Sequence, residues 1–237
     1  MNVQLEFVAH ACFRLWQEGR PTIVMDPYTP ATVRLEDDGS RLEADTVIVS
    51  SLTDAAHDNV QLVAGDPRVI NALDVARDGV EAIVNGEPLI TVQAKEHPNH
   101  NEHSPNDNAL YAFKAGDLWI LHMGDLGYGL TSEQLAPFVG HSDVFLVITG
   151  EANTPTHEEL DPMIDFLQPR WVVPMHYNIP PLSCGMSRIE KFLDARSSDP
   201  VVFPRHHTFA LPPPELKPGH PTIVVPEPSG YTATAGE

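Results

Sequence analysis

The 237-residue chain carries 14 Lys and Arg against 33 Asp and Glu, which gives a formal net charge of −19 at pH 7. A surface of that sign repels phosphate groups, so nucleic acids and anionic membranes are not expected as partners. Hydrophobic residues make up 42% of the chain, enough for a core, and no apolar run reaches the about 18 residues that cross a bilayer. The composition therefore predicts a globular cytoplasmic protein.

Predicted strands dominate the first half of the chain, where short β-branched and aromatic runs alternate with turn residues. These strands span residues 3–8, 12–17, 22–25, 46–50, 81–84, 89–94, 110–113 and 118–123. The Lys-Ala-Gly-Asp sequence at 114–117 is typical of a hairpin turn between the last two.

The second half of the chain alternates strands and helices. Continuous apolar runs at 145–148 and 171–173 indicate strands that are buried on both faces. Helices are predicted over residues 157–167 and 187–195, and another begins at Thr131, where the spacing matches a capping box. Strands followed by alternating strands and helices predict a mixed α/β layered fold.

We expect a single domain over residues 1–226, which ends with a short strand at 222–225, and a loosely ordered tail over residues 227–237. Cys12 and Cys184 are the two cysteines of the chain. They are too few for a disulfide framework and form no Cys-x-x-Cys pair, so both are expected to be free thiols.

Metal-ligating residue types follow several predicted strands. Asp26, His97, Asp125 and His176 each come at or just after the end of a different strand. Because α/β folds place ligand sites at the carboxyl ends of strands, these side chains are expected to converge. Imidazole nitrogen together with carboxylate oxygen suits zinc, manganese or iron better than calcium or magnesium.

Six short motifs resemble, in order and spacing, the metallo-β-lactamase superfamily, and in particular its branch of ascorbate-phosphate lactonase-like hydrolases. They occupy residues 8–13 (VAHACF), 25–28 (MDPY), 122–127 (HMGDLG), 130–135 (LTSEQL), 167–170 (LQPR) and 174–177 (PMHY). The likeness extends from about residue 5 to about residue 226. It implies a four-layer αββα sandwich with a metal site at the edges of the sheets.

The resemblance also implies roles for particular residues. His97, Asp125 and His176 correspond to metal ligands, and Asp26 to a carboxylate that orients a ligand imidazole. His10 and His122 are then expected to be neighbours of the pocket. In such hydrolases the metal activates a water and polarises the carbonyl or phosphoryl group that the water attacks.

The His-x-His-x-Asp-His signature of the family is incomplete in this chain. Residues 50–59 read SSLTDAAHDN, so His57 is the only histidine of the segment. With His57 as the last histidine of the signature, the other three positions hold Leu52, Asp54 and Ala56. A register one residue shorter places there Ser51, Thr53 and Ala55. Either register lacks three expected residues, so a dinuclear site of the usual type is not expected.

What remains is a site for one divalent transition metal bound by His57, Asp125 and His176, with His97 close by. Zinc is the expected metal, with manganese or iron as alternatives. His100 or His103, in the loop that follows His97, either replaces a lost ligand or is solvated.

Glu151 follows a predicted strand and is a candidate for a new ligand or a general base, the alternative being an ordinary charge at a strand end. The catalytic residues expected from the sequence are Asp125, His57 and Glu151.

The leading functional hypothesis is a metal-dependent hydrolase of a small ester, lactone or phosphoester with an altered, mononuclear site. The alternative is a noncatalytic binding or scaffold protein that keeps the fold and has lost the hydrolytic metal centre. A third hypothesis is metal-free acid/base chemistry by Glu151, Asp125 and His176. A small molecule is the expected partner under the leading hypothesis, and the sequence carries no indication of oligomeric state.

Overall fold

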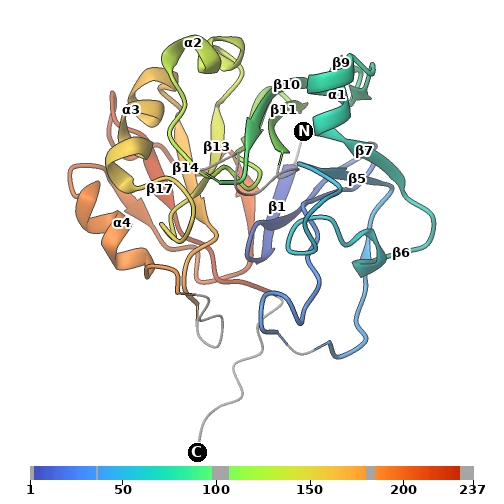
Figure 1. Cartoon of the computed structure of the whole chain (residues 1–237). Coiled ribbons are helices and arrows are strands. Elements are labelled where there is room, and N and C mark those ends of the chain that lie inside the picture. Colours follow the sequence, from blue (N-terminus) through green and yellow to red (C-terminus); the bar gives the residue numbers. More distant parts are fainter. Residues whose placement is uncertain (1–2, 36, 98–106, 180–184, 230–237) are drawn as a thin grey trace, which may run out of the picture.

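The computed structural model describes residues 3–35, 37–97, 107–179 and 185–229. Two β-sheets pack against each other, and helices pack on the seven-stranded sheet, which confirms the predicted α/β sandwich (Figure 1). Most of the tail that is predicted to be loosely ordered, residues 230–237, lies outside the described residues.

The first sheet has six strands. Their spatial order is β16 (Thr208–Leu211), β1 (Val3–Ala9), β2 (Cys12–Gln17), β3 (Ile23–Met25), β5 (Thr46–Val49) and β7 (Arg68–Asn71). The pairs from β16 to β3 are antiparallel, whereas β3, β5 and β7 run parallel to one another. The carboxyl ends of β3 and β5 therefore meet at one edge of the sheet.

The second sheet has seven strands. Their order is β10 (Ile90–Lys95), β11 (Asp107–Ala115), β12 (Leu118–His122), β13 (Val144–Ile148), β14 (Trp171–Met175), β17 (Thr222–Val224) and β15 (Val201–Val202). The five neighbouring strands β12, β13, β14, β17 and β15 run parallel to one another. Two small ribbons complete the strands, β4 (Leu42–Glu43) with β6 (Val63–Ala64) and β8 (Ile83–Val84) with β9 (Glu87–Pro88).

Four α-helices are described: α1 (Ala72–Asp78), α2 (Ser132–Leu135), α3 (His157–Leu167) and α4 (Ile189–Ala195). Short 3₁₀ turns lie at Val60–Leu62 and Ala136–Phe138. Helices α2 and α3 each begin with a capping box, from Thr131 and Thr156. Helices α2, α3 and α4 lie outside the seven-stranded sheet, and α1 packs on β10 and β11 (Figure 1).

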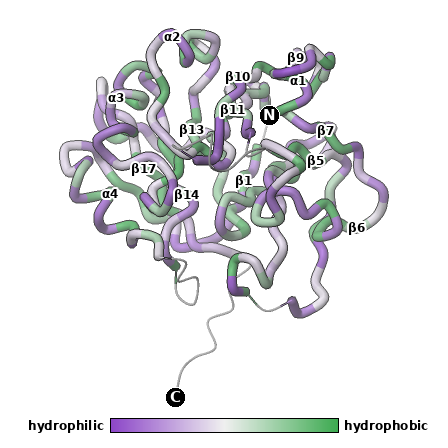
Figure 2. The backbone as a smooth tube through the Cα atoms, in the orientation of Figure 1, coloured by the Kyte–Doolittle hydropathy of each residue, from purple (hydrophilic) through white to green (hydrophobic). Residues whose placement is uncertain are grey.

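The alternation of side chains along the strands builds the layers. In β5, Ile48 faces the core between the sheets, whereas Val47 and Val49 pack on the outer face of the six-stranded sheet. That outer face is covered by loop residues that include Tyr28 and Val33. Figure 2 shows apolar stretches along the central strands and hydrophilic stretches in many outer loops. Within the described residues, none of the helices is long and apolar enough to cross a membrane.

Most predicted elements are confirmed, and the missed strands lie at sheet edges or in the small ribbons. The sequence analysis missed helix α1 and strands β4, β6, β7, β9, β15 and β16. Strand β7 is an edge strand with two exposed residues among its four, so its pattern lacks the buried alternation that identifies a strand. The helix predicted over residues 187–195 begins at Ile189.

Candidate metal centre

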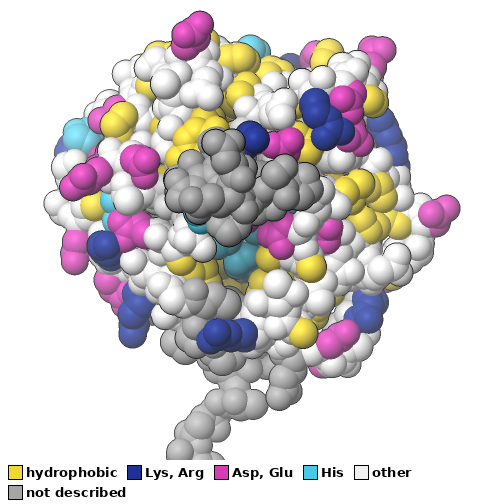
Figure 3. Space-filling model, in the orientation of Figure 1, with side chains coloured by type: hydrophobic (Ala, Val, Ile, Leu, Met, Phe, Trp, Pro, Cys, Tyr) yellow, Lys and Arg dark blue, Asp and Glu magenta, His cyan; other side chains and the backbone are white. Residues whose placement is uncertain are grey.

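Ligand-type side chains from both sheets meet where several strands end. His10 directly follows β1, Asp26 follows β3, and His176 follows β14. Asp125 lies three residues beyond β12, and His57 lies in the loop after β5. Figure 3 shows histidine side chains near the centre of this face with acidic side chains close to them. The structure thus brings together residues that are far apart in the sequence.

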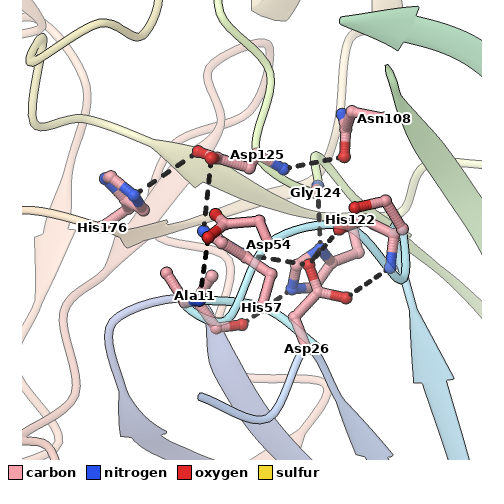
Figure 4. A network of polar contacts seen from close by, with 12 residues as sticks. Ala11, Asp26, Asp54, His57, Asn108, His122, Gly124, Asp125 and His176 are labelled. Atoms are coloured by element: carbon pink, nitrogen blue, oxygen red, sulfur yellow. Dashed lines mark hydrogen bonds and ion pairs between the residues drawn. The ribbon is translucent and has the colours of Figure 1, made fainter. Parts of the chain in front are cut away.

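Asp125 is the carboxylate between two imidazoles (Figure 4). Its Oδ2 lies 3.5 Å from Nε2 of His57, and its Oδ1 lies 3.5 Å from Nε2 of His176. These separations are too long for good hydrogen bonds. They match the spacing of about 3.3–3.6 Å between ligand atoms in a tetrahedral zinc site with bonds of about 2.0–2.2 Å.

Two groups of ligand atoms overlap at His57. His10, His57 and His176 form one group and Asp54, His57 and Asp125 the other, and in each group the ligand atoms lie within 4.8 Å of one another. All three histidines of the first group are buried. The arrangement offers imidazole nitrogen on one side and carboxylate oxygen on the other.

Several of these atoms have no hydrogen-bond partner within the described part of the chain. They are Nδ1 and Nε2 of His10, Nε2 of His57, Nδ1 of His176 and Oδ1 of Asp125, all of them buried. A buried polar atom without a partner costs free energy. A transition-metal ion bound among these residues would engage donor atoms of this kind, so the donor set fits a metal such as zinc.

Asp26 fixes the orientation of His57. Its Oδ1 accepts hydrogen bonds from the backbone N–H of Ser50 at 2.8 Å and from the hydroxyl of Tyr111 at 3.0 Å. Its Oδ2 accepts one from Oγ of Ser50 at 2.8 Å and lies 3.4 Å from Nδ1 of His57. A carboxylate behind one ring nitrogen turns the other nitrogen toward the site, as is usual for metal-binding histidines.

The charges of the site follow from burial and from the carboxylates. Burial alone would lower the pKa of His57, but the carboxylates of Asp125 and Asp26 outweigh it and raise the pKa to about 10. Burial, with the nearby His176 and His57, lowers the pKa of His10 well below its usual value. The carboxylates thus favour a positive charge at His57, which a divalent cation would supply in place of a proton.

His122 connects two of the ligand-bearing turns. Its Nε2 donates a hydrogen bond to the carbonyl of Ala11 at 2.9 Å, and its Nδ1 accepts one from the N–H of Gly124 at 2.9 Å (Figure 4). The N–H of Asp125 donates to Oδ1 of Asn108 at 3.0 Å. Because both ring nitrogens of His122 are used, it is placed to support the site rather than to bind a metal.

Three histidines of the sequence analysis do not join these groups in the described structure. His97 is half-buried at the end of the segment after β10 and belongs to neither group of ligand atoms. His100 and His103 lie outside the described residues.

Glu151 lies at the start of helix α3 and not among the ligand atoms. It accepts hydrogen bonds from the backbone N–H of His157 at 3.2 Å and from Oγ of Ser187 at 3.0 Å, and it forms an ion pair with Lys191. These contacts lower the pKa of Glu151 although burial alone would raise it. The geometry matches the alternative of a charge at a strand end, which here caps the next helix.

Two acidic residues near the site were absent from the candidates chosen from the sequence. Asp54 lies in the incomplete signature segment, so its position in the sequence could have identified it as a candidate ligand. Glu96 accepts a hydrogen bond from Oγ of Ser51 at 3.0 Å. Burial, followed by the charges of Asp125 and Asp54, raises the pKa of Glu96 to about 8. Its only signal in the sequence is its place at a strand end.

Gly150 lies against the backbone of His176, which makes it sensitive to substitution. A Cβ atom at this position would lie 2.1 Å from the carbonyl oxygen of His176. We expect Gly150→Ala to lower the free energy of unfolding by about 1–3 kcal/mol and to weaken zinc binding, because His176 must shift. Urea denaturation and zinc titration measure the two effects. Within the described residues, no other atom lies within 4 Å of the Cβ position of Gly140, so Gly140→Ala is the control for zinc binding, although its φ of +77° strains an alanine and lowers stability. Unchanged zinc binding by Gly150→Ala would contradict the prediction.

Comparison with known proteins identifies similar sequences and folds. The family model described as β-lactamase superfamily domain matches residues 4–176. A UPF0173 metal-dependent hydrolase of Thermococcus onnurineus is 24% identical over 219 residues, which cover 85% of this chain and 97% of that protein. A counterpart in Pyrococcus horikoshii is 26% identical over 226 residues, with the same coverage.

Solved structures show the same fold. A crystal structure from Thermotoga maritima, of a proposed Zn-dependent hydrolase of the metallo-β-lactamase superfamily, has a TM-score of 0.67 and 27% identity. The match covers 94% of this chain and 98% of that one. A metallo hydrolase of Ignicoccus hospitalis, at 20% identity and a TM-score of 0.59, shares the fold over 84% of this chain and 92% of its own.

Proposed function

This chain belongs to the β-lactamase superfamily, and we propose that it is a metal-dependent hydrolase with a mononuclear site of altered composition. The observation that carries the proposal is the set of buried donor atoms on His10, His57, His176 and Asp125 that have no hydrogen-bond partner among the described residues. The names of the related metal-dependent hydrolases support it.

Some residues of the site would bind the metal, and others orient the residues that bind it. When bound, a divalent metal supplies a Lewis acid and lowers the pKa of a water to about 7. His57, His176 and Asp125 would hold that ion, with Asp54 on the carboxylate side. Asp26 keeps the ring of His57 turned toward Asp125 by its contact with Nδ1.

A single ion is proposed because the signature segment provides few donors. Leu52 and Ala56 have no ligand atoms, and the Leu52 side chain points largely into solvent, with 49% of its surface exposed. Both groups of ligand atoms depend on the same imidazole, His57, whose Nε2 can bind one ion. Zinc is the proposed metal because imidazole nitrogen and carboxylate oxygen are both among its usual ligands.

A small ester or lactone is the proposed substrate, with a phosphoester as the alternative. The net charge of −19 favours the approach of neutral molecules over anionic ones. A panel of esters, lactones and phosphoesters, assayed with zinc-loaded protein, separates these classes.

Metal content is the decisive test of the proposal. Protein purified after supplementation with zinc or manganese is expected to contain about one equivalent of transition metal, because such sites bind tightly. The variant with both His57→Ala and His176→Ala is the control and should lose the metal. Less than about 0.2 equivalents in the unmodified protein would contradict the proposal.

The noncatalytic alternative is motivated by Leu52 and Ala56, which stand where the signature has ligands in one register. It predicts that metal-loaded protein hydrolyses none of the panel. Under the hydrolase proposal, at least one class of substrate is turned over, and turnover is lost in the His57→Ala and His176→Ala variant.

A further inference from the structure

His10 is a buried imidazole with no hydrogen-bond partner in the described part of the chain. Only 5% of the residue is exposed, and both ring nitrogens are buried with no hydrogen-bond partner among the residues that the structure describes. Its ring centroid lies 4.0 Å from that of His176 and 5.0 Å from that of His57. The three rings therefore form one cluster, in which the donor atoms of all three can lie within 4.8 Å of one another.

The backbone around His10 is held in place from two sides. The N–H of His176 donates a hydrogen bond to the carbonyl of His10 at 2.8 Å, and His122 donates one to the carbonyl of Ala11 at 2.9 Å. His10 has a φ of +57°, which is uncommon for a residue other than glycine. Such a conformation persists only when its surroundings impose it, and it is frequent at functional sites.

We infer that His10 is a metal ligand that takes the place of an imidazole missing from residues 50–59. The ion would then be held by His10, His57 and His176 with Asp125 beside them. This inference rests on the proposed function, because it names a ligand of the same site. In this ligand set, one imidazole comes from the turn between β1 and β2 and not from the loop after β5.

The ligand set has consequences for the metal and for its coordination. Three imidazoles favour zinc or another transition metal over magnesium or calcium, which prefer oxygen ligands. With Asp125 as a fourth protein ligand, the ion would take a water as a fifth ligand, an expansion that some catalytic zinc sites undergo.

The test compares His10→Ala with His97→Ala, the matched variant at the histidine that the sequence favoured. Zinc affinity is measured by competition with a chromophoric chelator, and the number of imidazoles is counted by zinc X-ray absorption. For His10→Ala we expect affinity to fall by about 100-fold or more, since loss of an outer partner of a ligand already costs about 10–100-fold. The imidazole count should fall from three to two, while His97→Ala leaves both unchanged.

Thermal unfolding gives a readout that a merely structural histidine would not change. Zinc should raise the Tm of the unmodified protein and of His97→Ala, because it binds the folded state. The same zinc concentration should raise the Tm of His10→Ala much less. His10→Asn, a smaller polar replacement, takes the place of the alanine variant if that one does not fold.

The outcomes separate this inference from the proposed function. If His10→Ala keeps three imidazoles and full affinity, or if His97→Ala loses an imidazole instead, His10 is not a ligand and the hydrolase proposal stands. If the unmodified protein binds neither zinc in these measurements nor manganese, the proposed function and the inference both fail.

Discussion

Asp125→Ala is expected to lower zinc affinity by more than about 100-fold and to abolish hydrolysis. The loss in affinity should exceed the about 10–100-fold that follows the loss of an outer partner of a ligand, because Asp125 would bind the ion directly. Asp125 is the carboxylate that lies 3.5 Å from an imidazole nitrogen of both His57 and His176. Its removal takes away a donor to the ion and the negative charge between the two rings. Zinc competition and metal analysis measure the first effect, and a substrate panel the second.

Two further variants complete this experiment. Asp125→Asn keeps the shape and removes the charge, so an intermediate zinc affinity is expected. Asp117→Ala changes an exposed aspartate in the turn between β11 and β12 and should bind zinc normally. If Asp125→Ala retained one equivalent of zinc at unchanged affinity, Asp125 would have to be removed from the ligand set.

Asp26→Ala is expected to destabilise the fold by about 3–5 kcal/mol, the usual cost of removing one partner of a buried charged network. Asp26 is fully buried and accepts hydrogen bonds from Ser50 and Tyr111, and His57 lies against its Oδ2. Without Asp26, the donors of Ser50 and Tyr111 lose their acceptor, and Nδ1 of His57 loses the carboxylate that orients the ring. Urea denaturation of the metal-free protein measures the change.

Asp26→Asn separates orientation from folding. The amide keeps an oxygen near Ser50 and loses the charge next to His57, so zinc affinity should fall by about 10–100-fold with a smaller loss of stability. Asp45→Ala is the matched control, because Asp45 is exposed and accepts a single backbone hydrogen bond from Thr22. Equal destabilisation by Asp26→Ala and Asp45→Ala would show that the buried network has no special role.

Local patterns in the sequence were sufficient for the strands that carry the site. The apolar runs that end before Asp26 and His176 are buried strands in the structure, β3 and β14. Asp125 follows β12 as predicted. These predictions depend only on apolar runs and on turn residues within a few positions, so one sequence contains the information.

The composition of the ligand cluster was decided by contacts between distant segments. Nothing local distinguishes His10, which lies in the cluster, from His97, which does not. The difference arises because the turn after β1 pairs with the residue after β14, through the hydrogen bond from His176 to His10. Glu151 likewise is held at helix α3 by residues that the sequence could not place beside it.

The sequence by itself determined the layered fold, the acidic charge and the strand ends at which polar side chains gather. The tertiary structure alone decided which of these side chains face one another and which ring nitrogens lack a hydrogen-bond partner within the described part of the chain. The physical reason is that strand formation depends on neighbours along the chain, whereas the geometry of a metal site depends on sheet pairing and packing between strands far apart in the sequence.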